Sequence, residues 1–349
     1  MNQLSFLDET PPLKTIEWQP TRSAGQERLE SFLPRAGKAY AQARNFDFGP
    51  EDRSNISCLS PWLRHRLVCE QEVVTATLAR QGFSSSDKFI QEVFWRAYFK
   101  GWLEQRPGVW SSYRRELRRT LDLLETDAPL ANRYAEATEA RTGIECFDTW
   151  ARELVASGYL HNHSRMWFAS IWIFTLQLPW QLGADFFYRH LLDGDPASNT
   201  LSWRWVGGLH TKGKTYLARS SNIARFTNGR FNPAGQLAAV APALEEDGVG
   251  ASIPLRPADP FPHEQQYGLL ITEEDCHPES LGLAPTALVG LTATDQRSSL
   301  ATGECASAFA RGAIQDAMQR AEANCGVKRS ETGPTEAEDW SKHLLAFAA

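Results

Sequence analysis

The stretch LLDGDPASNTLSWRW, residues 191–205, combines side chains that seldom lie so close together in a chain. Two acids flank Gly194, and one asparagine and two tryptophans follow. Dense acids are typical of a solvated loop, whereas dense indoles are typical of a core or of contact with a planar ligand. A segment that must meet both demands is predicted to line a pocket.

An arginine, Arg165, lies in the second helix expected within the most apolar part of the chain, residues 146–180. This residue, Arg165, needs an anionic partner if its helix is buried, because an unpaired buried charge is costly. Asp193 or Asp195 would serve as that partner. A buried ion pair that contacts no ligand explains the same residues, so this pattern alone leaves both interpretations open.

The segment SNISCLS, residues 54–60, places hydroxyl groups and free backbone N–H groups before Pro61, where they could bind an anion. It has neither the lysine nor the glycines of a mononucleotide phosphate loop. Ordinary helix capping by Ser60 is the alternative. In that case the helix is expected to start at Ser60 and to continue through Val74.

No metal site is predicted. The six cysteines form no Cys-x-x-Cys pair and no zinc spacing, so reduced thiols are expected, with a metal or iron–sulfur cluster as the lesser alternative. His161 and His163 are two positions apart, and alternate residues of a helix point in different directions. No third ligand lies at a suitable spacing.

The elements that must position these residues follow from the apolar spacing. Helices are expected over 23–49, 60–74, 86–103 with a cap at Ser86, 112–140 with a break at Pro129, 146–180 divided near Gly158, and 185–192. No alternation typical of strands precedes residue 235, so this part is expected to be all-α. YGLLIT and TALVGLTA are predicted strands, and ASAFARGAIQDAMQRAEA a helix, in a small α/β tail.

Composition and charge divide the chain. The expected parts are an N-terminal extension (1–24), a helical domain (25–235), a linker rich in proline and acids (236–266) and the α/β tail (267–349). The net charge of −6 is the balance of about +4 over residues 50–235 and about −10 beyond them. A basic middle permits a polyanionic partner. Without a membrane span or signal pattern, a cytoplasmic protein with no membrane partner is expected.

Taken in order, five short motifs resemble the FAD-binding catalytic domain of the DNA photolyase/cryptochrome family. The motifs are Y-x-x-x-R at Tyr40 and Arg44, S-x-L-S-P at 57–61, E-x-x-W-R at 92–96, GYLHNHSRM at 158–166, and DGDPASN with W-x-W at 193–205. The resemblance covers roughly residues 25–235. It implies a mainly α, all-helical photolyase-type fold that lacks the family's usual N-terminal antenna domain, which resembles a Rossmann fold.

The resemblance implies FAD as the cofactor. The residues that would hold it are Tyr40, Ile56, Ser57, Cys58, Leu59, Ser60, Glu92, Arg96, Asn162, Arg165, Asp193, Gly194, Asp195 and Asn199. Asn199 would face the flavin N5, where an asparagine is more similar to the repair enzymes than to plant or animal cryptochromes. Ile56 replaces a usual threonine and removes one hydroxyl group from the pyrophosphate site.

The resemblance also assigns residues to damaged DNA and to electron transfer. Trp95, Met166 and Trp205 would line the cavity for a flipped pyrimidine dimer, together with Glu92, and Arg44 and His163 would lie near DNA phosphates. Trp203 and Trp180 would form the inner part of a tryptophan chain that reduces the flavin. No tryptophan matches the outer position, for which Tyr134 is a candidate. The catalytic set is therefore Glu92, Trp180, Trp203 and Asn199.

Two functions remain open from the sequence. The first is FAD-dependent, blue-light-driven repair of pyrimidine dimers, which the set of substrate residues favours. The second is a light- or redox-sensing flavoprotein without repair activity, which the missing antenna domain, His163 and the absent outer tryptophan favour. In either case, the acidic tail is a possible binding site for a partner protein.

Overall fold

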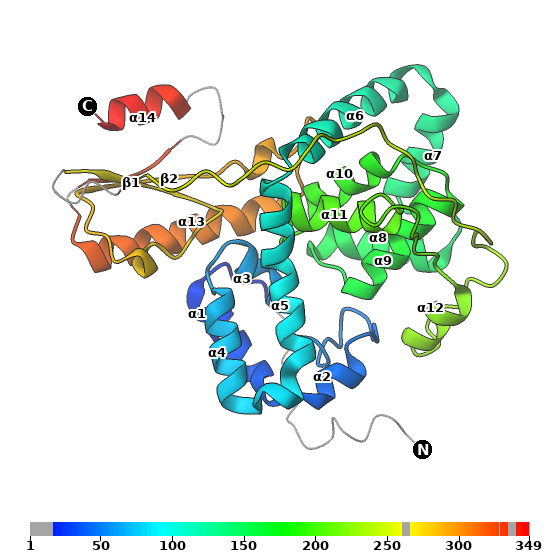
Figure 1. Cartoon of the computed structure of the whole chain (residues 1–349), viewed down its shortest axis with the longest axis horizontal. Coiled ribbons are helices and arrows are strands. Elements are labelled where there is room, and N and C mark those ends of the chain that lie inside the picture. Colours follow the sequence, from blue (N-terminus) through cyan, green and yellow to red (C-terminus); the bar gives the residue numbers. More distant parts are fainter. Residues whose placement is uncertain (1–16, 260–265, 328, 334–339, 349) are drawn as a thin grey trace.

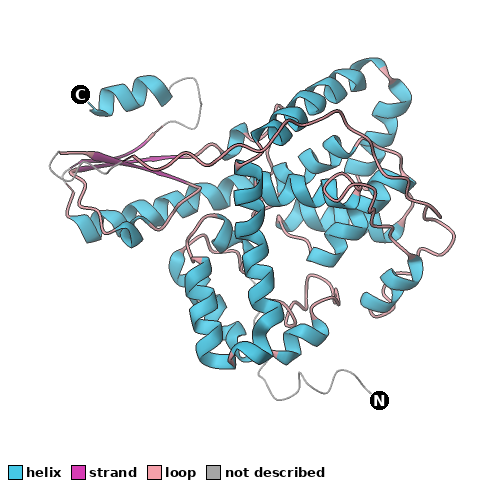
Figure 2. Cartoon of the chain, in the orientation of Figure 1, coloured by secondary structure: helices cyan, strands magenta, loops and turns pink. Residues whose placement is uncertain are grey.

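The computed structural model describes residues 17–259, 266–327, 329–333 and 340–348 (Figure 1). The first twelve α-helices along the chain are Arg22–Phe32 (α1), Lys38–Ala43 (α2), Ser60–Arg64 (α3), Glu70–Gln81 (α4), Phe83–Glu104 (α5), Pro107–Thr126 (α6), Ala128–Thr138 (α7), Glu145–Ser157 (α8), Asn162–Ser170 (α9), Trp180–His190 (α10), Pro196–Val206 (α11) and Ser220–Phe226 (α12). Strands occur only after residue 267 of the described chain (Figure 2). The expected mainly α fold is confirmed.

Several helix boundaries follow the predicted signals. The long charged segment divides at Asp127, whose side chain accepts a hydrogen bond from the Leu130 N–H and so caps α7, with Pro129 in the first turn. The apolar segment divides at Gly158, which takes the left-handed conformation that ends α8. A π-helical turn, Ile171–Thr175, continues α9.

The bounds of four predicted helices need correction. The single helix expected over 23–49 divides in two, because α1 ends at Phe32 and α2 covers only Lys38–Ala43, after a 3-10 turn and Gly37. The helix at Ser60 ends at Arg64 rather than Val74, because Arg66 takes a positive φ of 50° and the next N–H groups bond back to the Trp62 carbonyl. Ser60 is the first helical residue and not the cap, since Leu59 holds that position.

The other two helices start earlier than their side chains indicated. Helix α5 begins at Phe83, and the Ser86 hydroxyl donates to the Gly82 carbonyl instead of capping the helix. Helix α10 begins at Trp180, directly after Pro179, and not at Asp185. In both cases, a glycine or proline sets the boundary before the capping candidate is reached.

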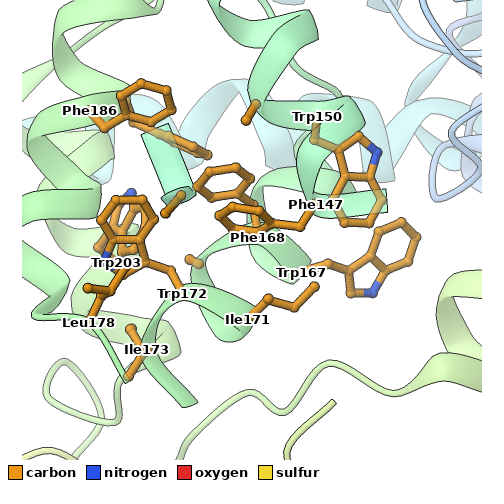
Figure 3. Packing of buried hydrophobic residues seen from close by; sticks show 14 of the residues in the cluster. Phe147, Trp150, Trp167, Phe168, Ile171, Trp172, Ile173, Leu178, Phe186 and Trp203 are labelled. Carbon is orange, nitrogen blue, oxygen red and sulfur yellow. The ribbon is translucent and has the colours of Figure 1, made fainter. Parts of the chain in front are cut away.

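The larger hydrophobic core gathers aromatic side chains from helices α6–α11. Figure 3 shows part of it, with Phe168 stacked on Phe147 at 4.1 Å between ring centroids and Trp172 and Trp203 beside them. Trp150, Trp167 and Trp172 are fully buried. Much of the high tryptophan content therefore serves packing, since each buried indole removes a large apolar surface from water.

The C-terminal part is a small α/β unit. Strands Gly268–Thr272 (β1), Ala287–Leu291 (β2) and Arg329–Thr332 (β3) form a parallel sheet in that order, and helix Glu304–Cys325 (α13) packs against it (Figure 1). Helix Trp340–Ala348 (α14) follows. The two predicted strands and the helix are present in the predicted places.

The α/β unit shares a core with the N-terminal helices. Ile271, Leu288 and Phe309 belong to the same buried cluster as Leu29 and Phe32. Across the part of the chain that is described, none of the helices has the length and apolar character needed to cross a bilayer.

Residues 236–259 contain no helix or strand, but they are not loose. Glu246 pairs with Arg204 of α11, Val249 packs on a small core that includes Leu201, and the Ile253 N–H donates to a carbonyl at the end of α5. The predicted linker therefore lies along the helices. Residues 1–16 and 260–265, parts of the predicted extension and linker, lie outside the described residues, and the domain boundaries stay predictions.

Candidate functional site

Arg165 and Asp193 form a two-pronged ion pair in the structure. The two terminal guanidinium nitrogens donate to the two carboxylate oxygens at 3.0 and 2.9 Å, and Nε donates to the Leu160 carbonyl at 2.8 Å. The Asp193 side chain is buried. This fixed geometry explains why an arginine is tolerated within the apolar segment and places it directly beside the loop 193–195.

Asp195 lies in the same loop and has two tasks. One carboxylate oxygen accepts the Ser198 N–H at 2.8 Å and so caps α11. The other, Oδ2, lies 3.6 Å from Nη2 of Arg96 and 3.9 Å from Nζ of Lys100. Burial opposes ionisation of Asp195, but Arg96 and the neighbouring cations hold its pKa below the usual range.

These buried groups are suited to a polar ligand. Asp195 Oδ2 and the Nε and Nη2 of Arg96 have no hydrogen-bond partner among the described residues, although all three atoms are shielded from water. Unsatisfied buried polar atoms are costly, so they mark a place where a bound group completes the hydrogen bonding. A flavin ring, which carries donors and acceptors along one edge, fits this set.

Helix α11 continues the site. Asn199 and Trp203 follow Asp195 at intervals of four residues, so the three share one face of the helix. The Asn199 side-chain amide donates to the Ala184 carbonyl at 2.7 Å, which fixes its orientation against α10. Trp205 lies on another face, where its ring stacks on Tyr216 with 5.5 Å between centroids.

Helix α5 carries both exposed and buried site residues. Arg96 faces inward to Asp195 and to Glu70, whose Oε1 lies 3.3 Å from its Nε. Four residues earlier, Glu92 forms an ion pair with Arg44 of α2. Trp95, between them, is 50% exposed. The same helix therefore joins the loop 193–195 to a solvent-facing surface.

The loop 56–60 offers two hydroxyl groups. Ile56, Cys58 and Leu59 are buried, whereas Ser57 and Ser60 are only half-buried. Arg28 donates to the carbonyls of residues 57 and 56 at 2.6 and 3.0 Å, which holds the loop in place. Tyr40 lies under the neighbouring helices, with its ring 5.1 Å from that of Phe89.

The predicted site residues at the start of α9 differ in exposure and in hydrogen bonding. Asn162 is exposed and Met166 is half-buried. His163 shares hydrogen bonds with the Asn45 carbonyl at 2.8 Å and the Tyr216 hydroxyl at 3.2 Å, and it stacks on Trp167. Burial lowers its pKa, so the ring is neutral and already bonded, which does not favour the predicted phosphate contact.

The two predicted tryptophans of the electron chain lie in different ring clusters. The Trp203 ring contacts Trp172 at 6.1 Å and Phe187 at 5.2 Å between centroids. The Trp180 ring contacts Tyr113 at 5.5 Å. Trp172, fully buried in the core of Figure 3, is a ring that the sequence did not single out.

The sequence patterns also missed three cations around the loop 193–195. Lys100 lies one turn after Arg96 on α5, at helical spacing that could have revealed it. Arg64 donates to the Gly194 carbonyl at 2.7 Å, and Arg297 from the α/β unit donates to the Leu191 carbonyl at 3.1 Å. No local pattern marks the last two.

One cluster of possible metal ligands lies elsewhere. Ligand atoms of Cys69, Glu72 and His277 lie within 4.8 Å of one another. Arg22 forms a two-pronged ion pair with Glu72, and Arg66 lies 3.5 Å from the Cys69 sulfur. These guanidinium groups already neutralise the cluster, and its charge does not favour a further cation.

Comparison with known proteins matches the region of this site to a known family of domains. Residues 89–240 match the family model described as the FAD binding domain of DNA photolyase. Two deoxyribodipyrimidine photo-lyases, from Synechococcus sp. and Streptomyces griseus, are 30% and 33% identical over 57% and 48% of this chain. Cryptochrome-1 of Arabidopsis thaliana is 28% identical over 63% of it.

The chain spans less than half the length of these relatives, with 43%, 36% and 32% of their sequences matched. The matched part contains α5 to α12 and hence the loop 193–195 with its partners Arg96 and Arg165. FAD is the cofactor of this domain. Residues 89–240 therefore match the FAD binding domain of DNA photolyase, and the relatives that match this chain include photo-lyases and a cryptochrome.

Proposed function

We propose that this protein uses light and bound FAD to repair pyrimidine dimers in DNA. When bound, FAD supplies the light absorption and the single electron that open the cyclobutane ring of the dimer. The relatives named deoxyribodipyrimidine photo-lyase support this class of reaction. A cytoplasmic location stays a prediction.

The arrangement of α5 carries the proposal. Trp95 and Glu92 lie at the surface, while Arg96, on the next position of the helix, reaches Asp195. One helix would therefore contact a lesion through Trp95 and the bound cofactor through Arg96. Trp95 lies among other exposed aromatic side chains of α5, Phe94 and Tyr98, and a group of exposed aromatic rings of this kind is typical of a binding surface on which bases can stack.

Five of the residues proposed to hold FAD lie in or next to the loop 193–195. Arg96, Asp195, Asn199, Arg165 and Asp193 would bind and orient the flavin. Ser57, Ser60 and Tyr40 would hold the phosphates, and Asn162 would complete the pocket, as the family resemblance implies. These residues would hold the flavin in one orientation through hydrogen bonds and fixed charges, and they would keep water away from the edge of the ring.

The residues proposed for DNA come from helices α5, α9 and α11 and are exposed or half-buried. Trp95, Met166 and Trp205 offer apolar surface to a base that has left the duplex. Glu92, held by Arg44, can accept a hydrogen bond from a base edge. The positive charge of residues 50–235 favours the phosphate backbone, so binding should weaken with salt.

A sensing role without repair is the second candidate, and His163 favours it. Its ring is neutral and bonded to Asn45 and Tyr216, so the predicted phosphate contact would require these bonds to break. The similarity to a cryptochrome is consistent with this alternative.

The test uses purified protein loaded with FAD and a DNA oligonucleotide that carries one thymine dimer. Illumination with a reductant should restore the absorbance of intact thymine, and a dark sample should show no change. Trp95→Ala should weaken binding of the damaged strand by about 1–3 kcal/mol, the usual value of one stacked base. Phe94→Ala, which removes a neighbouring exposed ring from the same helix, is the matched control.

Flavin binding with no restored thymine would contradict repair and favour the sensing role. Equal losses in Trp95→Ala and Phe94→Ala would show that the surface of α5 acts only through general apolar contact, and not through a specific lesion site.

A further inference from the structure

The end of α10 depends on the α/β unit for its hydrogen bonds. The last carbonyls of a helix have no partner within it, and they attract cations. Here Arg297 donates to the Tyr188 and Leu191 carbonyls at 3.3 and 3.1 Å, and the Gly303 N–H donates to the Arg189 carbonyl at 2.9 Å. The loop 193–195 starts directly after these carbonyls.

Arg64 binds the loop itself. Its Nε donates to the Gly194 carbonyl at 2.7 Å, and its Nη2 pairs with Glu274, just after β1, at 2.5 Å. The Arg64 side chain is 1% exposed. Lys100 lies between Glu274 and Asp195, at 3.8 and 3.9 Å from their carboxylate oxygens. Glu274 of the α/β unit thus orients two of the cations that face the loop, Arg64 and Lys100.

The contact between loop and α/β unit is close. A methyl group on Gly194 would lie 2.8 Å from the Arg297 guanidinium and 2.8 Å from the Tyr188 carbonyl, so no side chain fits there. In the shared core, Phe309 of α13 packs edge-on against Trp62 at 6.1 Å between centroids. A shared buried core and buried hydrogen bonds indicate permanent docking rather than a loose appendage.

We propose that the α/β unit, residues 267–325, is a clasp that holds the loop 193–195 in the conformation that binds the flavin. Arg64, Glu274 and Arg297 are then positioning residues: they touch the loop backbone and its cations, not the cofactor. The inference rests on the proposed role of Asp193 and Asp195 in FAD binding. It gives the C-terminal part a task within the chain, in place of the predicted partner-binding role.

The test compares Arg297→Met, Arg64→Met and Glu274→Gln in the full-length chain. Arg64→Met strands no buried carboxylate, because Glu274 is 50% exposed. Arg22→Met is the matched control: the Arg22 guanidinium also binds one carbonyl, of Leu67, and one partly exposed carboxylate, of Glu72, and among the described residues it forms no hydrogen bond or ion pair with the loop 193–195.

Two measurements test separately whether the α/β unit holds the loop and whether the loop binds the flavin. Hydrogen exchange of the amides over residues 191–199, without FAD, should become faster in Arg297→Met and Arg64→Met and stay unchanged in Arg22→Met. The Kd for FAD should rise about tenfold or more in the same two variants, since a displaced binding group loses most of its contribution. Glu274→Gln should show the same changes to a smaller extent.

Unchanged exchange in all three loop variants would overturn the clasp, whatever happens to the flavin. Faster exchange with an unchanged Kd would overturn its role in flavin binding. If the wild-type chain bound no FAD, the proposed function would fail and the positioning role with it, and the exchange data would still decide whether the unit holds the loop.

Discussion

The ring of Trp203 lies edge-on against the ring of Trp172, with 6.1 Å between centroids and 89° between the planes. Trp172 in turn contacts Tyr134 at 6.1 Å and 82°. Tyr134 is only partly buried, and this burial raises the pKa of its phenol. These three rings form a continuous path from the candidate flavin site to the surface, and the predicted partner Trp180 is not part of it.

We therefore expect Trp172→Phe to slow light-driven reduction of bound flavin more than Trp180→Phe does. The electron would move from Trp172 to oxidised Trp203 and from Tyr134 to Trp172, with a thiol in solution restoring Tyr134. Transient absorption should show a tyrosyl radical in the wild type that disappears in Tyr134→Phe. A larger effect of Trp180→Phe would instead support the path that the family resemblance implies.

Gly183 makes the contact between the two indoles possible. A methyl group there would lie 2.3 Å from the Trp203 ring and 2.9 Å from the Trp172 ring. Gly183→Ala should lower the free energy of unfolding by about 1–3 kcal/mol, because an overpacked core must shift. Gly101→Ala in α5 meets no atom within 4 Å and should raise stability by up to about 1 kcal/mol. Urea denaturation of both variants measures the difference, and equal effects would contradict the tight packing.

The sequence could predict that Arg165 pairs with Asp193 or Asp195, because a charge in an apolar helix demands an opposite charge nearby. It could also predict the strands and helix of the α/β unit, whose apolar runs are short and bounded by turns. The docking of that unit was beyond such reasoning. Arg64 and Gly194 are 130 residues apart, and a surface arginine has the same local pattern.

Trp172 was missed for a different reason. It lies among aromatic residues at helical spacing, which indicates a core, and a core is where the structure places it. The contact of Trp172 with Trp203 depends on Gly183 of α10, which lets the two rings approach each other closely. The helix boundaries at Phe83 and Trp180 were missed because a glycine and a proline override weaker capping signals.

His65 should make stability depend on pH. Burial, with Arg64 and Arg297 nearby, holds its pKa well below the ordinary value, and the ring is bonded to the Glu273 carbonyl. Below about pH 6.5 the unfolded chain binds a proton there and the folded chain does not, so the free energy of unfolding falls as pH decreases. The pKa of His161 is likewise lowered, to about 4, by burial.

Denaturation at pH 7.5 and pH 5 tests this dependence. His65→Gln keeps a donor for the Glu273 carbonyl but cannot be protonated, so its loss of stability on acidification should be smaller than that of the wild type. Each unit of pKa difference is worth about 1.4 kcal/mol. Parallel pH profiles for the two proteins would show that His65 does not titrate differently in the folded and unfolded chains.

Asp195 allows stability and flavin binding to be separated. Its Oδ1 caps α11, and its Oδ2 faces Arg96 without a hydrogen-bond partner among the described residues. Asp195→Ala removes both functions and should cost about 1 kcal/mol of stability through the lost cap. Asp195→Asn keeps an acceptor for the Ser198 N–H and should therefore lose less stability than Asp195→Ala, although both variants lose the negative charge that faces the buried Arg96.

FAD affinity should respond differently from stability in these two variants. Both remove the carboxylate that neutralises Arg96 and Lys100, and both remove a charged acceptor, whose hydrogen bonds are worth about 1.5–3 kcal/mol. Titration of the apoprotein with FAD should therefore give a weaker Kd for both, by about tenfold or more. If Asp195→Asn bound FAD with the wild-type Kd, the charge of Asp195 would have no role in flavin binding. Asp195 would then act only as the cap of α11.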